Sequence, residues 1–163
     1  MTGLKLTNDF IRESLIFIIS AIGLVSSYLI GSPLLATVSA IVLFTSFDVI
    51  GYYRMGTTSN KEIVPYYRVM QTIFQHIVTA FLWFLFGWQF ALIYNLFWWF
   101  GGCDILYYVI LKQNYFTYGP MFWLWWTPAG IVISRFGESP SPRLATIQSI
   151  VGLVLCIVLY VIL

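Results

Sequence analysis

The sequence is dominated by apolar segments about as long as a lipid bilayer is thick. An α-helix rises about 1.5 Å per residue, so roughly 20 apolar residues cross the hydrocarbon core. Segments of this length lie near residues 14–31, 33–53, 65–87, 89–111, 117–134 and 143–163. Because backbone polar groups in lipid need internal partners, these segments predict helices. The expected fold is an all-α polytopic membrane protein, with one domain over residues 1–163 built as a bundle of six transmembrane helices.

Composition and charge decide which broad class of protein these segments belong to. Hydrophobic residues make up 60% of the 163 residues and charged residues 9%, which is more apolar surface than one soluble core of this size hides. Lipid is therefore expected to be the main solvent and membrane lipid a partner. The eight Lys and Arg residues are scattered, whereas nucleic-acid binding needs a clustered basic face. No nucleic-acid partner is expected.

The fifth segment leaves the topology open between two arrangements. It contains Pro120 and Pro128, and proline removes helix hydrogen bonds and kinks or breaks a helix. The alternative is five spans plus a Pro-broken re-entrant segment at 117–134. Cytoplasmic loops carry an excess of Lys and Arg, so both arrangements predict a multi-pass protein with a cytoplasmic N-terminus. Six spans leave only Arg135 and Arg143 outside, and five spans leave no basic residue outside.

Polar residues inside three of the segments predict one polar cluster. If 33–53 and 89–111 both end at the cytoplasmic face, Asp48 and Asp104 share a depth roughly 8 to 10 Å from their helix ends. The helix at 65–87 starts on that side, and six of its polar residues occupy an arc of about 140°. Lipid does not satisfy such groups, so we expect the arc to face a cluster enclosed by the three helices and open to the cytoplasmic leaflet. The six residues are Arg68, Gln71, Thr72, Gln75, His76 and Thr79.

The aspartates and the lone histidine are the candidate catalytic residues. A carboxyl group in an apolar site can stay protonated near neutral pH, which suits the general acid that we assign to Asp104. Asp48 is expected to act as a base or to stabilise positive charge, with His76 as a partner. One His and two scattered Asp lack the spacing of a metal site, so neither a metal nor another cofactor is expected. The residues expected to bind substrate are Gln71, Gln75, Tyr52, Tyr107, Tyr108, Trp98 and Asn95.

Three functions stay open. An integral membrane enzyme would act on an apolar lipid or isoprenoid-type substrate by isomerisation, cyclisation, hydration or hydrolysis in an aromatic-lined pocket. A structural or assembly subunit, in a homo-oligomer or a larger membrane complex, would dock through the small residues that recur in the first and last segments. A proton-coupled transporter or channel would use the aspartates and His76 as a relay. The enzyme leads, because two carboxyl groups near one membrane face suit chemistry better than a path across the membrane.

Overall fold

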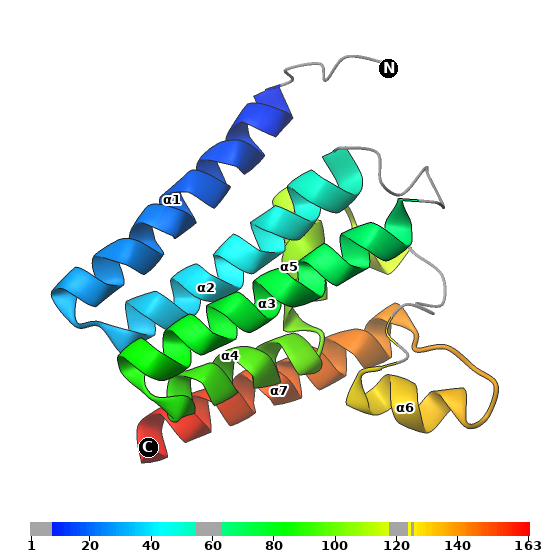
Figure 1. Cartoon of the computed structure of the whole chain (residues 1–163). Coiled ribbons are helices and arrows are strands. Elements are labelled where there is room, and N and C mark those ends of the chain that lie inside the picture. Colours follow the sequence, from blue (N-terminus) through cyan, green and yellow to red (C-terminus); the bar gives the residue numbers. More distant parts are fainter. Residues whose placement is uncertain (1–7, 55–62, 118–123, 125) are drawn as a thin grey trace.

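The computed structural model describes residues 8–54, 63–117, 124 and 126–163, and every regular element in these ranges is a helix (Figure 1). The prediction of apolar helices long enough to cross a membrane is confirmed in part. Four helices are long and apolar enough to cross a bilayer, over Asn8–Ile30, Pro33–Tyr52, Val64–Phe86 and Pro142–Ile162. The elements in chain order are α1 (Asn8–Ile30), α2 (Pro33–Asp48), the π-helix η1 (Val49–Arg54), α3 (Val64–Phe86), α4 (Trp88–Trp99), α5 (Gly102–Leu111), the 3-10 turn η3 (Tyr115–Thr117), α6 (Pro128–Ser134) and α7 (Pro142–Ile162).

The six-span bundle is not confirmed. The predicted span at 89–111 is divided into α4 and α5. The described part of the segment at 117–134 holds only the end of η3, residues 124 and 126–127, and α6, which has seven residues. Its other residues, 118–123 and 125, lie outside the described ranges.

Short sequence signals set where several helices begin. Ser32, Thr127 and Ser141 each precede a proline, and each side chain accepts a hydrogen bond from a backbone N–H in the first turn of α2, α6 or α7. A Ser or Thr cap followed by Pro is a favoured helix start, because the cap satisfies a free donor and proline has no N–H to leave unpaired.

The interruption between α4 and α5 falls at Phe100 and Gly101. Gly101 has φ +78°, a left-handed conformation that glycine adopts without steric cost. The Phe100 carbonyl accepts a hydrogen bond from the Ser149 hydroxyl of α7 at 2.9 Å. Helix α7 therefore compensates for a backbone bond that an unbroken helix would have made itself.

The small residues that recur in α1 and α7, named the small-residue stripes here, pack against other helices of the same chain. In α7, a Cβ on Gly152 would lie 2.4 Å from the Cβ of Phe100, directly after α4, and the Cys156 thiol donates to the Ile93 carbonyl of α4 at 3.4 Å. In α1, a Cβ on Gly23 would lie 2.6 Å from the Ser39 hydroxyl of α2. These stripes are thus occupied by contacts within the chain.

Helix α2 lies at the centre of the bundle. The buried share of its apolar window is 56%, against 17–28% for α1, α3 and α7. Phe44 and Ala40 of α2 pack with Val78 of α3 and Tyr94 of α4 in the main core cluster. The last residue of this central helix is Asp48, so the core holds one of the two predicted carboxyl groups in place.

Two contacts show where the chain returns to the bundle after α5. Arg12, near the start of α1, donates to the Ile110 carbonyl near the end of α5 at 2.9 Å, and Ala145, near the start of α7, packs with Tyr108 of α5. The end of α5 and the start of α7 therefore lie at the same end of the bundle, named the charged end here because Arg12 and Lys112 lie there. The α1–α2 turn, the α3–α4 turn and the C-terminus lie at the opposite end (Figure 1).

Candidate functional site

Asp48 lies at the charged end of α2 and is held by a tyrosine of α3. Its Oδ1 accepts a hydrogen bond from the Tyr67 hydroxyl at 2.8 Å, and the Tyr67 side chain is buried, with 4% exposure. The ring fits because Gly51 has no side chain, since a Cβ at Gly51 would lie 2.5 Å from Tyr67 Cε2. Sequence reasoning missed Tyr67, although its position near the start of α3 places it at the depth of Asp48.

The helix changes its winding directly after Asp48. Residues Val49–Arg54 form a π-helix, a rare form that often occurs at functional sites. Within this turn, Tyr52 packs on the Tyr67 ring with centroids 5.6 Å apart. The Arg68 guanidinium lies 4.7 Å from the Tyr52 ring centroid, close enough for a cation–π interaction. Tyr52 therefore lies in the same group as Asp48.

Asp104 lies in the first turn of α5 and is half-buried. Its helix, α5, contacts both α2 and η1. The two aspartates, for which the sequence predicts a common depth, therefore lie on neighbouring helices. The name carboxylate site is used below for four residues, Asp48, Asp104, Tyr67 and Arg68.

Further tyrosines border the carboxylate site from α5 and η3. Tyr107 packs against the cluster that holds Val49 of η1, the residue after Asp48, and Tyr115 packs with Tyr108 of α5. The rings of Tyr107 and Tyr108 are 5.4 Å apart, and those of Tyr108 and Tyr115 are 5.1 Å apart. The buried Tyr115 hydroxyl has no hydrogen-bond partner among the described residues.

An apolar hollow of about 310 Å³ lies beside these tyrosines. Tyr115 lines the hollow and packs on Tyr108 of α5, the helix that carries Asp104. The other lining residues are Ile105, Tyr108, Val109, Gln113, Asn114, Phe116 and Thr146.

Gln75 and Asn95 form a separate polar cluster between α3 and α4. The Gln75 amide donates to Asn95 Oδ1 at 3.3 Å, and the Asn95 amide donates to the Thr79 hydroxyl at 3.0 Å and to the Ala91 carbonyl at 2.7 Å. Gln75 follows Tyr67 by eight residues, or about 12 Å of helix rise. This cluster joins two helices and does not border the carboxylate site.

The remaining predicted residues lie elsewhere. His76 is exposed on the outer side of α3, where its Nδ1 bonds the Thr72 carbonyl at 2.7 Å. The Gln71 side chain accepts a bond from Arg68 at 2.6 Å at the edge of the site. The Trp98 ring stacks on Trp126 at a centroid distance of 4.3 Å. The predicted polar arc of α3 is therefore divided: part of it faces the bundle and part of it faces outward.

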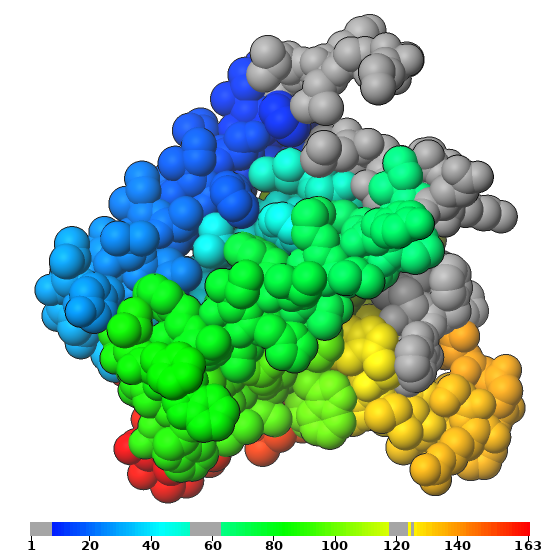
Figure 2. Space-filling model, in the orientation of Figure 1, coloured from blue at the N-terminus to red at the C-terminus, as the bar shows by residue number. Residues whose placement is uncertain are grey.

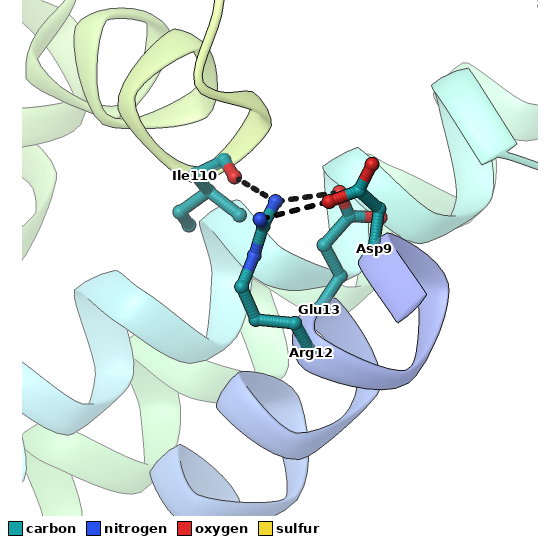
Figure 3. Close-up of polar contacts among 4 residues, drawn as sticks. All are labelled: Asp9, Arg12, Glu13 and Ile110. Atoms are coloured by element: carbon teal, nitrogen blue, oxygen red, sulfur yellow. Dashed lines mark hydrogen bonds and ion pairs between the residues drawn. The ribbon is translucent and has the colours of Figure 1, made fainter. Parts of the chain in front are cut away.

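Sequence reasoning also missed an ionic cluster at the start of α1 (Figure 3). Arg12 donates to Asp9 at 2.9 Å, to Glu13 at 3.4 Å and to the Ile110 carbonyl at 2.9 Å. Glu13 is fully buried. Because Ile110 lies in the last turn of α5, whose carbonyl groups lack helix partners, Arg12 stabilises the end of the helix that carries Asp104.

Across the described ranges, no three His, Cys, Asp or Glu side chains come together as a metal site would need. Comparisons with protein-family models, curated proteins and solved structures found no match to the chain. The chemistry of the site therefore rests on its own residues.

Proposed function

We propose that the chain is an integral membrane enzyme that performs acid–base chemistry on an apolar lipid or isoprenoid-type substrate. The observation that supports this most is the packing of α5, which carries Asp104, against α2, which carries Asp48, beside tyrosine rings and an apolar hollow. Ionisable residues within membrane segments are costly, so a pair of them favours a functional role.

Each residue has a role in this proposal. Asp104 is the general acid that protonates a double bond or an ether oxygen of the substrate. Asp48, oriented by the Tyr67 hydroxyl, accepts a proton or stabilises the positive charge that develops. The tyrosine rings add π faces that stabilise a cation. His76 has no role in the reaction, because it lies on the outer side of α3.

The proposed topology has five crossings, with the charged end in the cytoplasm. It is supported by the common location of the end of α5 and the start of α7. All eight Lys and Arg residues then belong to the cytoplasmic side, as the bias of basic residues toward cytoplasmic loops favours. Substrate would enter the site from the cytoplasmic leaflet.

A transporter is the second candidate, and one observation favours it. The interruption at Phe100 and Gly101 makes the fourth apolar segment a discontinuous helix, the kind of element that transporters place at their binding sites. An assembly subunit is less favoured, because the small-residue stripes that would dock partners are occupied within the chain.

The deciding experiment compares Asp104→Asn with Asp9→Asn in lipid nanodiscs that contain an extract of native membrane lipids. Asp9 is the matched control because it is an exposed aspartate at the start of α1, with 58% side-chain exposure. The enzyme proposal expects the wild type and Asp9→Asn to change the mass or isomer profile of one lipid class, and Asp104→Asn to leave that profile unchanged. Thermal melting of each variant checks that it is folded.

Two results would contradict the enzyme. Conversion of lipid by folded Asp104→Asn at the wild-type rate would remove Asp104 from the reaction. Proton-coupled uptake into liposomes that Asp104→Asn abolishes, with no lipid converted, would establish the transporter instead. Unfolding of both Asp48→Asn and Asp104→Asn would assign the aspartates to stability alone.

A further inference from the structure

The outer side of α3 carries polar residues at a depth where lipid offers no partner. His76 follows Val64, the first residue of α3, by 12 residues and precedes Phe86, the last, by 10, so it lies near the middle of a membrane-length helix. His76 and Thr72 are both exposed. Unsatisfied polar groups in hydrocarbon cost several kcal/mol, so a protein surface is expected to cover them.

The hydrogen bonds of these two residues show what the covering surface must supply. A carbonyl oxygen only accepts, so the 2.7 Å contact between His76 Nδ1 and the Thr72 carbonyl places the proton on Nδ1. In this tautomer Nε2 is an acceptor that needs a donor. The Thr72 hydroxyl donates to the Arg68 carbonyl at 2.9 Å, and a hydroxyl can rotate toward a better acceptor.

We propose that this side of α3 is a two-fold interface with a second copy of the same chain. Two copies in one membrane run parallel, so residues of equal depth face each other. A helical side chain leans toward the N-terminus, and the contact with the Thr72 carbonyl places the His76 ring level with Thr72. Each His76 then accepts a hydrogen bond from Thr72 of the other copy, and the two-fold axis makes both bonds at once.

The spacing of the exposed residues on α3 fits such a pair. Val69, Thr72 and His76 are all exposed and separated by three and four residues, which is the spacing of the seam between two parallel helices. Thr79, the next position of this pattern, contacts Asn95 of α4 within the chain, so the seam is confined to the first half of α3. Figure 2 shows α3 running across the front of the molecule. An unrelated partner would need a donor of its own at this depth, whereas a second copy supplies both donor and acceptor.

The interface is tested by disulfide crosslinking of the full chain in native membranes. Val69→Cys places a thiol on the seam, and Val25→Cys on α1 is its matched control. The native valines are equally exposed, at 60% and 62%. Val69 lies five residues after the start of α3, toward the charged end, and Val25 lies five residues before the end of α1, toward the opposite end. Met70→Cys is a second control, at the same depth as Val69 but about 100° around α3. The native Cys103 and Cys156 are buried, so the wild type gives the background.

With a lipid-permeable oxidant, Val69→Cys is expected to give a product of twice the monomer mass, and the two controls are not. Adding Thr72→Val or His76→Leu to Val69→Cys should lower the yield of dimer about tenfold at equal protein density, since each removes both symmetric bonds. Gel filtration of the detergent-extracted protein checks that each variant is folded.

Several results would overturn the proposal. Equal crosslinking of Val69→Cys and Val25→Cys would show random collision. A folded Val69→Cys that does not crosslink, or one whose product has another mass, would show that no second copy covers this face. An unchanged dimer yield in both double variants would remove the His76–Thr72 bonds from the interface. None of these readouts depends on the proposed enzymatic activity.

Discussion

At the scale of single residues, the contact that matters most to the carboxylate site is the bond from Tyr67 to Asp48. The tyrosine ring is held by stacking on Phe47 at 6.1 Å and by the space at Gly51, so the position of the hydroxyl is set by packing. A donor held in this way orients the carboxylate oxygen that accepts its bond. The proposed general base needs such an orientation before its substrate arrives.

Tyr67→Phe tests this role, because it removes the hydroxyl and keeps the ring. We expect turnover to fall at least about tenfold, since Asp48 loses its orientation. We also expect the free energy of unfolding to fall by about 1–3 kcal/mol, the cost of an unpaired buried acceptor. Lipid conversion and thermal melting in nanodiscs measure the two effects. Tyr66→Phe is the control, because the neighbouring Tyr66 is 78% exposed. Equal activity of both variants would contradict the role of Tyr67.

The sequence predicts a common depth for Asp48 and Asp104 from helix rise alone, which residue counting captures. It does not single out Tyr67, and it places in the same cluster His76, which lies exposed on α3. The chain has eleven Tyr residues, and only packing distinguishes Tyr67 and Tyr115 from those at the membrane interface. The polar residues of α3 do lie on one continuous helix, as the predicted arc requires. Its facing was set by Val78 and Leu82, which are buried on the other side of the helix from His76.

At the scale of elements, the interruption at Gly101 determines where Asp104 lies. It separates α4, which packs along α7, from α5, which contacts α2. Hydropathy shows 89–111 as one apolar segment, so the sequence did not predict this division. The glycine pair was a local signal that the apolar pattern hid. Only the contacts with Ser149 and Gln148 of α7 show why the chain turns there.

Gly101→Ala tests two constraints at this turn, the left-handed backbone conformation and the close packing of α7. A side chain in the left-handed conformation costs about 1–2 kcal/mol. A Cβ at Gly101 would also crowd Gln148 Nε2 at 3.3 Å and Ser149 Oγ at 3.4 Å. Gly137→Ala is the matched control, because Gly137 has φ +73° and no atom within 4 Å of its added Cβ. We expect Gly101→Ala to lose about 1–3 kcal/mol more stability than Gly137→Ala, through crowding. Equal melting temperatures would show that the neighbours move freely.

At the scale of the whole molecule, the charged end gathers what the proposed function uses. The carboxylate site, the apolar hollow and the Arg12 cluster all lie toward this end. The opposite end is formed by short turns and by the C-terminus (Figure 1). From the positions of Lys and Arg, the sequence predicts that this end faces the cytoplasm. The number of membrane crossings is harder to predict, because the length of an apolar segment does not show whether it crosses the membrane or returns to the same side.

Thiol labelling distinguishes the two topologies. Asn114→Cys and Glu138→Cys place exposed thiols before and after the disputed segment. With five crossings, both react with a membrane-impermeant reagent from the same side. With six crossings they react from opposite sides. Right-side-out and inverted vesicles give the comparison, and wild-type chain, whose described thiols are buried, gives the background. Labelling from opposite sides would restore the six-span bundle.

The turn of only two residues between α1 and α2, Gly31 and Ser32, has a consequence for biosynthesis. The two helices cannot part far, so we expect them to leave the translocon together as one hairpin while the rest of the chain is still on the ribosome. Arg12 and Asp48 are then already in the membrane when their later partners emerge. Tyr67 reaches Asp48 first, and the Ile110 carbonyl reaches Arg12 second. We therefore expect these two polar contacts to form in the order in which α3 and α5 are translated, each with a residue that is already in the membrane.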